Sequence, residues 1–172
     1  MIFPVSADGW MALPAGAVRC AIGRGGVCAA SEKREGDGRT PAGLWPVRRV
    51  LWRPDRGRQP ASQLSTAAIN PHDGWCDAPN DESYNRAVTL PYPASAEHLW
   101  RDDHLYDRVV VLGHNDDPVV SGAGSAIFLH LARPDFSPTE GCVALAAAAM
   151  EQFLSVCAPG DLLAITLPSG DI

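Results

Sequence analysis

Residues 128–145 read FLHLARPDFSPTEGCVAL, a stretch that joins an aliphatic run to an alanine-rich one through a polar, proline-containing segment. The aliphatic run is typical of a buried strand, and the alanine-rich run is typical of a helix. His130 lies near the end of the first run and Cys142 directly before the second. We therefore expect a strand, a polar loop and a helix in this order, with the histidine and the cysteine at the two ends of the loop.

This arrangement suits nucleophilic catalysis. A cysteine directly before a helix lies near unpaired backbone N–H groups and the positive end of the helix dipole, which favours thiolate over thiol. A histidine on a neighbouring strand, here His130, can act first as base and then as acid toward a leaving amine. The backbone N–H groups of Gly141 and Cys142 lie in the turn, where they can point at an oxyanion. An inert core cysteine and a structural histidine remain the alternative interpretation of the same residues.

Outside this stretch, the pattern predicts a mainly β chain. β-Branched and aliphatic runs bounded by Gly, Asn and Pro indicate buried strands. A hairpin is expected where two short runs flank a glycine-rich turn at residues 23–26. The expected strands are residues 17–22, 27–30, 43–52, 108–113, 125–131 and 162–167.

Two helices are expected. Residues 145–157 are rich in Ala, Met, Gln and Leu, and Pro159-Gly160 follows as a stop signal. A shorter helix is expected from Ser95, whose side-chain oxygen can cap it, to Arg101. Residues 69–93 carry too many turn residues for a helix and are expected to form a structured loop region.

Composition and length bound the fold. The chain has 172 residues, of which 46% are hydrophobic and 20% charged, an ordinary globular balance that excludes a disordered chain. Its 16 glycines and 15 prolines suit many short strands joined by turns. We expect a single domain over residues 1–172, a β-sandwich or barrel-like pair of sheets with one or two short helices.

Charge and hydropathy exclude two classes of protein. The net charge is −6 and no run of Lys or Arg exceeds two residues, so nucleic-acid binding is not expected. No segment approaches the roughly 20 apolar residues of a membrane-spanning helix. The first ten residues, MIFPVSADGW, show no secretory signal peptide.

The five cysteines are not spaced as a C-x-x-C motif, which argues against a structural zinc site or a redox pair. In the expected hairpin, Cys20 and Cys28 would lie opposite each other, so a disulfide is one interpretation; burial of both thiols is the favoured one. His114, His130 and Cys142 match no standard metal-ligand spacing. No metal and no cofactor are expected.

Several segments together resemble a known family. GSAIFLHLARPDFSPTEGCVAL at 124–145 is similar to the signature of the YkuD-type L,D-transpeptidase catalytic domain, in which a histidine on a strand precedes a Gly-Cys pair. TPAGLW at 40–45 resembles the family's upstream T-P-x-G turn. The segments that resemble a proteobacterial branch of the family are DGWCDAP at 73–79, YNRAV at 84–88 and LWRDDHLYDRVVVLGHNDDPV at 99–119.

The resemblance covers nearly the whole chain and implies a function. It implies that Cys142 is the nucleophile, that His130 is its partner, and that the Gly141 and Cys142 amides contribute to an oxyanion hole. The common family form has Ser-His-Gly-Cys followed by an arginine two residues later, whereas Thr139-Glu140 and Val143-Ala144 flank the Gly-Cys pair here. These differences concern substrate contacts more than thiol chemistry.

The implied activity is cross-linking of peptidoglycan peptide stems, donor and acceptor, through a Cys142 thioester. The alternatives are an L,D-carboxypeptidase or amidase that uses the same site, or a catalytically silent module that binds wall peptides. The substrate implies a periplasmic location.

Four further residues are candidates for substrate contacts, each with a structural alternative. Arg133 can hold a carboxylate of diaminopimelate or pair with Asp135. His114 can line the cleft or pair with Asp116. Trp75 and Arg86 can wall the cleft, although a tryptophan in a small domain is often a core residue.

Overall fold

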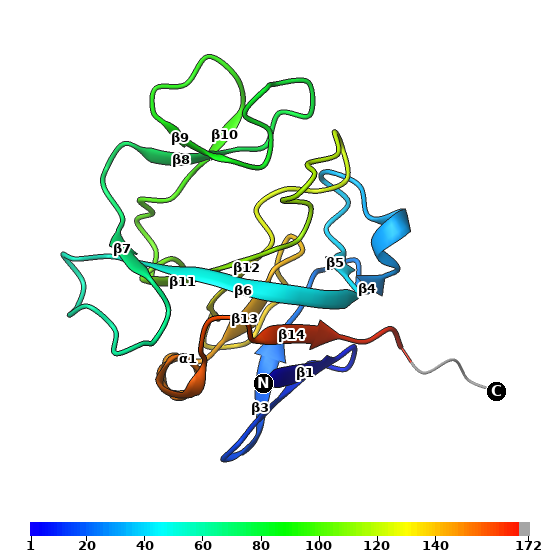
Figure 1. Ribbon diagram of the computed structural model, residues 1–172, viewed down its shortest axis with the longest axis vertical. Helices are drawn as coiled ribbons and strands as arrows, with labels where there is room; N and C mark the ends of the chain where they lie inside the picture. Colours follow the sequence, from blue (N-terminus) through cyan, green and yellow to red (C-terminus); the bar gives the residue numbers. More distant parts are fainter. Residues whose placement is uncertain (169–172) are drawn as a thin grey trace.

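Strands dominate residues 1–168, the part of the chain that the computed structural model describes (Figure 1). One α-helix, α1, spans Ala147–Val156, and a 3₁₀ turn, η1, spans Ala30–Glu32. The strands are β1 (Ile2–Ser6), β2 (Trp10–Leu13), β3 (Gly16–Ala21), β4 (Val27–Cys28), β5 (Thr40–Pro41), β6 (Gly43–Trp52), β7 (Thr66–Ala68), β8 (Asp73–Cys76), β9 (Ala87–Thr89), β10 (Ala96–His98), β11 (Arg108–Leu112), β12 (Phe128–Leu131), β13 (Val143–Leu145) and β14 (Leu162–Ile165).

The largest sheet closes on itself. Its order is β11-β12-β13-β3-β2-β1-β14-β6-β7, and β6 also pairs with β11, so the strands from β11 to β6 form a ring and β7 is attached to its outside. In that closing pair, Val50 of β6 lies opposite Val110 of β11. Closure leaves no free edge between these strands. The predicted barrel-like, mainly β fold is confirmed.

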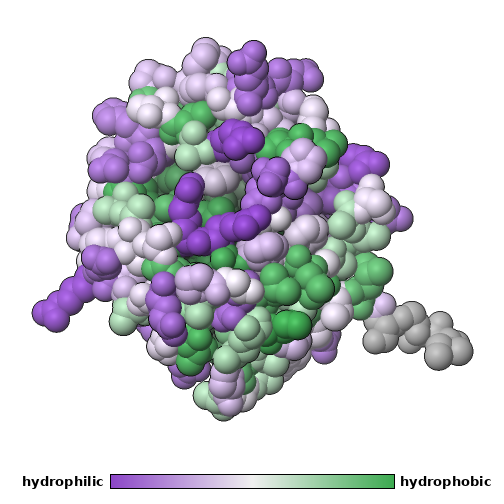
Figure 2. Space-filling view, in the orientation of Figure 1, coloured by the Kyte–Doolittle hydropathy of each residue, from purple (hydrophilic) through white to green (hydrophobic). Residues whose placement is uncertain are grey.

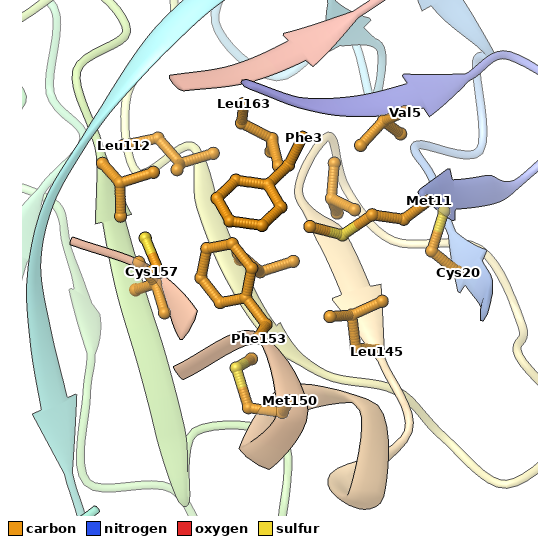
Figure 3. Packing of buried hydrophobic residues seen from close by; sticks show 14 of the residues in the cluster. Phe3, Val5, Met11, Cys20, Leu112, Leu145, Met150, Phe153, Cys157 and Leu163 are labelled. Carbon is orange, nitrogen blue, oxygen red and sulfur yellow. The ribbon is translucent and has the colours of Figure 1, made fainter. Parts of the chain in front are cut away.

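Side chains fill the inside of the ring (Figure 3). Successive side chains of a strand point to opposite faces, so Phe3 and Val5 of β1 point inward while Ile2 and Pro4 are exposed. Helix α1 closes the core with Phe153, whose ring packs edge-on against Phe3 at 4.8 Å between centroids. The interior is therefore a packed core.

A second apolar cluster lies on the outer face of the ring. Val109 and Val111 of β11 belong to it, whereas Val110 and Leu112 face the inner core. Because β11 is buried on both faces, its sequence is a continuous apolar run rather than an alternating one. Phe128 and Cys142 belong to the outer cluster.

A small antiparallel sheet, with the order β10-β8-β9, covers this side of the ring (Figure 1). Its Trp75 belongs to the same outer cluster as Phe128, so the two layers share that cluster. On the face seen in Figure 2, apolar side chains gather over β1 and β14, where Ile2 is exposed, while hydrophilic ones gather in the middle of the face and the upper part is mixed.

Several predicted elements are confirmed and others are corrected. Strand β6 spans residues 43–52 as predicted, and β11 and β14 lie within their predicted ranges. The predicted hairpin of residues 17–22 and 27–30 is wrong, because β3 pairs with β2 and β13 while β4 pairs with β5. The turn between them is instead held by other segments: the Gly23 N–H donates to Thr40 Oγ1 at 2.8 Å. All five cysteines are free and buried, so Cys20 and Cys28 form no disulfide.

The predicted helix from Ser95 to Arg101 is also wrong. Strand β10 occupies this segment, with Glu97 opposite Trp75 of β8. A seven-residue helix gains little by itself, whereas pairing with β8 gives the segment backbone partners on a packed surface. Residues 69–93, expected as a loop region, also contain β8 and β9, and they contain no helix, as predicted.

The helix after Cys142 begins later than predicted. Residues Val143–Leu145 form strand β13, which pairs with β12 and β3, so α1 begins at Ala147. Cys142 therefore precedes a strand and not a helix. Within residues 1–168, no helix combines the length and apolar character needed to cross a membrane.

Candidate active site

A cavity of about 480 Å³ opens on the outer face of the ring, next to β12 and the start of β13. Both Cys142 and His130 line it. The other lining residues come from the 33–36 loop, from the segment after β8, from β10 and the loop after it, and from the segments that precede and follow β12: Lys33, Glu35, Gly36, Asp77, Glu97, Arg101, Leu105, Tyr106, Ser125, Ala126, Ile127, Arg133, Pro138, Thr139 and Glu140.

Strand pairing brings the two predicted reactive groups to one face. Leu129 lies opposite Val143 in the parallel pair of β12 and β13, so Cys142 lies beside Phe128. His130 is two residues after Phe128 on the same strand, and its side chain therefore points to the same face of the sheet. The thiol and the imidazole share the cavity for this reason.

The Cys142 thiol is held by two backbone groups. Its S–H donates to the Ala126 carbonyl at 3.2 Å, and the Phe128 N–H donates to Sγ at 3.4 Å. The residue is 8% exposed. Burial, together with the negative charge of Glu97, raises the pKa of the Cys142 thiol to about 12, while the Phe128 N–H and Lys33 act in the opposite direction. The thiol is therefore protonated at neutral pH.

This protonation state corrects the expected activation by a helix N-terminus. Because α1 begins only at Ala147, Cys142 has no helix dipole behind it. Burial dominates instead, and burial favours the neutral thiol. A resting thiolate is thus not a feature of this site.

His130 is a neutral imidazole with a free acceptor nitrogen. The Leu131 carbonyl lies 2.8 Å from Nδ1, so Nδ1 carries the proton and donates, and Nε2 has its lone pair free. The side chain is nearly inaccessible, with 5% of the residue exposed. Burial, together with the positive charges of Arg101 and Arg133, lowers the pKa of His130 to about 4, while the hydrogen bond to Leu131 acts in the opposite direction. A neutral imidazole is the form that can accept a proton.

The turn that carries Cys142 is fixed by Thr139. The Gly141 N–H donates to Thr139 Oγ1 at 3.1 Å, and the Thr139 hydroxyl donates to the Cys142 carbonyl at 2.6 Å. Gly141 has a φ of +133°, and a Cβ there would lie 2.9 Å from the Arg39 carbonyl oxygen, so the position requires glycine. Because the Gly141 N–H is already bonded to Thr139, the role of Gly141 in an oxyanion hole stays a prediction.

The Cys142 N–H differs from that of Gly141, because Thr139 does not accept it. It takes part in none of the turn, loop or side-chain hydrogen bonds recorded for residues 1–168. It lies on the residue that carries the thiol, where a carbonyl oxygen would develop negative charge during attack. The Cys142 amide is thus the better placed of the two predicted oxyanion donors.

The cavity wall carries charges of both signs. Arg133 is exposed on the wall and forms no ion pair with another described residue, so the alternative pairing with Asp135 does not occur. Asp135 instead accepts the Ser137 N–H at 3.0 Å. Arg133 is therefore free to bind an anion.

Two glutamates of the wall, Glu35 and Glu97, are held in place by tyrosines. Tyr106 Oη donates to Glu97 Oε1 at 2.6 Å, and the Tyr106 ring packs edge-on against His130 at 5.3 Å. Glu35 Oε2 accepts hydrogen bonds from Tyr84 Oη at 2.5 Å and from Ser125 Oγ at 2.7 Å. These contacts fix two carboxylates in a cavity that also contains three basic side chains.

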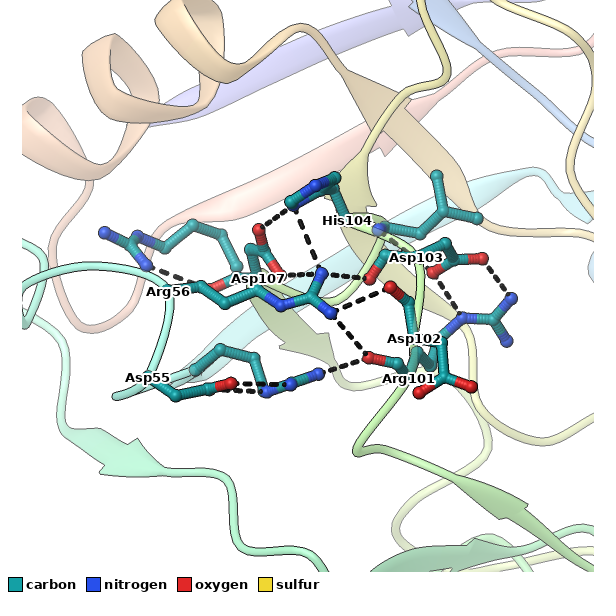
Figure 4. Close-up of polar contacts among 10 residues, drawn as sticks. Asp55, Arg56, Arg101, Asp102, Asp103, His104 and Asp107 are labelled. Carbon is teal, nitrogen blue, oxygen red and sulfur yellow. Dashed lines mark hydrogen bonds and ion pairs between the residues drawn. The ribbon is translucent and has the colours of Figure 1, made fainter.

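Two arginines anchor the loop that presents Arg101 and Tyr106 (Figure 4). Arg53 is buried, stacks on Trp100 at 3.8 Å and donates to the Arg101 carbonyl at 2.5 Å. Arg56 donates to the carbonyls of the next two residues of the loop at 2.8 and 2.7 Å. The backbone of this cavity wall is thereby bonded to the segment that follows β6.

The other three predicted substrate contacts do not line the cavity. Trp75 is buried behind it, with its ring edge-on to Phe128 at 5.1 Å, as the core alternative would have it. His114 is buried, and its Nε2–H donates to the Ala123 carbonyl at 3.0 Å rather than pairing with Asp116. Arg86 is exposed outside the cavity. Contact between these three and a substrate stays a prediction.

Lys33, Glu35, Glu97 and Tyr106 are among the wall residues that sequence reasoning missed. Lys33 and Glu35 belong to the polar run 31–40, which has the composition of a solvated loop. The Thr40-Pro41 turn at the end of this run could have indicated that the run lies near the site, because the turn resembles a motif of the family. Glu97 was assigned to a helix that does not form.

A protonated thiol beside a neutral, proton-accepting imidazole suits a cysteine acyl-transfer site, in which attack on a carbonyl and proton transfer occur together. A comparison of the chain with models of protein families identifies its family. The YkuD family model, described as the L,D-transpeptidase catalytic domain, matches residues 8–165. The chain belongs to this family. No curated protein and no solved structure matches the chain.

Proposed function

We propose that the protein is a peptidoglycan L,D-transpeptidase that cross-links peptide stems through a Cys142 thioester. The observation that carries the proposal is the shared cavity of Cys142 and His130, in which the free Nε2 of the imidazole can accept the thiol proton. The family match supplies the substrate class. The periplasm, where such a substrate occurs, is the proposed location.

Acylation follows from these two groups. Cys142 Sγ attacks an amide carbonyl of the donor stem while its proton moves to His130 Nε2, and the π electrons of the carbonyl move to oxygen. When the carbonyl re-forms, the C–N bond breaks and the His130 imidazolium gives its proton to the departing amine. The products are a thioester on Cys142, a free amine and a neutral imidazole.

Transfer to the acceptor reverses these proton movements. The amine of a second stem attacks the thioester carbonyl and loses a proton to His130 Nε2. The C–S bond then breaks, Sγ recovers the proton, and an amide joins the two stems. Water in place of the amine would release the donor as a free acid, which is the L,D-carboxypeptidase or amidase reaction.

The charges of the cavity favour an amine as acceptor. Glu35, Asp77 and Glu97 bring carboxylates to the same space as the thiol, and carboxylates attract an ammonium group. Arg133 lies near His130 and suits a carboxylate of a stem peptide, whereas Arg101 is already paired with Asp103. A substrate with both amino and carboxyl groups therefore finds partners on the wall.

One observation favours a second candidate, a silent module that binds wall peptides. Cys142 is buried, and the pKa of its thiol is raised to about 12. Such a thiol reacts slowly with small electrophiles unless a base removes its proton. The wall charges would serve binding in either case.

The test is to incubate the protein with purified disaccharide tetrapeptides and to follow the products by mass spectrometry. A dimer that lacks one terminal residue is expected from the intact protein, and its fragmentation distinguishes a 3,3 from a 1,3 cross-link. Cys142→Ala and His130→Gln should abolish it. Cys157→Ala, which removes a thiol of the barrel core, is the matched control and should retain activity.

The other products identify the alternatives. Tripeptide without dimer would identify the hydrolase. Retention of tetrapeptide without any Cys142-dependent product would identify the binding module.

A further inference from the structure

Lys33 is a buried lysine at the wall of the cavity. It is 2% exposed, although it belongs to a polar run of the sequence. Two glycines make room for its side chain: a Cβ at Gly124 would lie 3.0 Å from Lys33 Cε, and a Cβ at Gly141 would lie 3.5 Å from Nζ. The ammonium therefore lies against the residue that precedes Cys142.

The ammonium is anchored on one side. Lys33 Nζ donates to the Arg34 carbonyl at 3.1 Å and to the carboxylate of Asp37. Asp37 is itself fixed, because it accepts the N–H groups of Arg34 and Arg39, each at 2.8 Å. An ammonium has three N–H donors, and the third has no partner within residues 1–168.

Resting on the proposed function, we propose that Lys33 is a positioning residue that acts through Cys142: its anchored ammonium stabilises the negative charge that develops on Sγ as the thiol proton leaves and that attack then moves to the carbonyl oxygen. The stabilisation is electrostatic. A fixed cation in a site with little water interacts strongly with nearby charge and needs no rearrangement when that charge forms.

The other groups around the thiol leave this role to Lys33. Glu97 from β10, Tyr106 from the segment before β11 and His130 from β12 face Cys142. Five further titratable residues line the same cavity: Glu35, Asp77, Arg101, Arg133 and Glu140. Glu97 opposes negative charge on sulfur, and His130 is neutral until it takes the thiol proton. Lys33 itself faces Asp37 and, across Gly124, His114. It is the cation that favours a thiolate at Cys142.

The test measures the thiol directly. Iodoacetamide labels the folded protein at several pH values between 7 and 9, and peptide mapping by mass spectrometry reports the rate at Cys142 alone. Loss of a nearby positive charge raises a thiol pKa by about one unit, so Lys33→Met should label Cys142 about tenfold more slowly at each pH. Lys33→Gln, which keeps a donor for Asp37, gives the same readout if the methionine variant is unstable. Lys33→Arg keeps the charge and should stay within about threefold of the unchanged protein.

Two results would overturn the role of Lys33. The first is a Cys142 labelling rate in folded Lys33→Gln or Lys33→Met equal to that of the unchanged protein. The second is a labelling rate in Lys33→Arg as low as in the neutral variants, which would indicate that Lys33 acts by packing rather than by its charge. Tetrapeptide turnover, measured in parallel, separates this inference from the proposed function. If the neutral variants label more slowly but the unchanged protein makes no product from tetrapeptides, the effect of Lys33 on Cys142 is supported and the transpeptidase function is rejected.

Discussion

The hydroxyl of Thr139 donates to the carbonyl of Cys142 at 2.6 Å and accepts the Gly141 N–H at 3.1 Å. One side chain therefore binds the backbone on either side of the Gly141–Cys142 peptide bond. Residues between His130 and Cys142 otherwise form a polar loop with few buried contacts. The position of Sγ in the cavity therefore depends on this threonine.

Thr139→Val should destabilise the protein and slow the reaction. The substitution keeps the shape of the side chain and leaves a buried N–H and a buried C=O unpaired, which costs about 1–3 kcal/mol in the free energy of unfolding. We expect a fall in kcat larger than any change in KM, because Sγ is displaced. Urea denaturation and turnover of tetrapeptides measure the two effects. Thr139→Ser keeps the hydroxyl and should remain close to the unchanged protein; equal losses in both variants would contradict this account.

The buried imidazole of His130 should make stability depend on pH. Its pKa is about 4 in the folded protein, against a usual value of 6.5. Between these values the unfolded chain binds a proton that the folded protein does not, so stability is full above pH 6.5 and falls as the pH is lowered to 4. The loss amounts to about 3 kcal/mol. Urea denaturation at pH 4.5 and 7 measures it.

His130→Gln is the control for this dependence. Glutamine does not titrate, so the variant should lose less stability between pH 7 and 4.5 than the unchanged protein does. Equal losses in the two proteins would show that other groups cause the dependence.

The Cys142 thiol should behave as a protonated thiol over the whole neutral range. Since its pKa is about 12, labelling by iodoacetamide should rise about tenfold per pH unit from pH 7 to 10 without a plateau. A plateau beginning below pH 8 would indicate a resting thiolate and contradict the burial argument.

Glu97→Gln should speed the labelling of Cys142. The carboxylate opposes a thiolate, and glutamine removes the charge while keeping an oxygen for Tyr106 Oη. We expect the labelling rate at pH 8 to rise about fivefold, opposite in sign to the neutral Lys33 variants. An unchanged rate would mean that Glu97 is too well solvated to influence the thiol.

Arg53→Met should loosen the wall of the cavity that carries Arg101. The side chain is buried, pairs with Asp55 and donates to the Arg101 carbonyl, so its loss should lower the free energy of unfolding by about 2 kcal/mol. KM for the tetrapeptide should rise more than kcat falls. Arg58→Met is the matched control, because that side chain is exposed and makes no hydrogen bond within residues 1–168. A similar effect in both variants would argue against the anchoring role.

Strand β11 was predicted well because its residues from Val109 to Leu112 are all buried. Such an apolar, β-branched run has few other stable environments. The errors at residues 17–30 and 95–101 have a different cause. Each segment is short, and its partner strands lie outside it: β3 pairs with β2 and β13, β4 with β5, and β10 with β8. Local preferences do not record such pairings.

The sequence by itself singled out His130 and Cys142, to which we assign the proposed chemistry, because a histidine on an apolar strand and a Gly-Cys turn are visible as local patterns. Only the tertiary structure decided the protonation states of these two side chains. Burial and the neighbours Glu97 and Lys33 set the pKa of the Cys142 thiol, and these neighbours come from segments far from it in the chain. Protonation depends on the surrounding charges and on access to water, and both exist only once the strands and loops have packed.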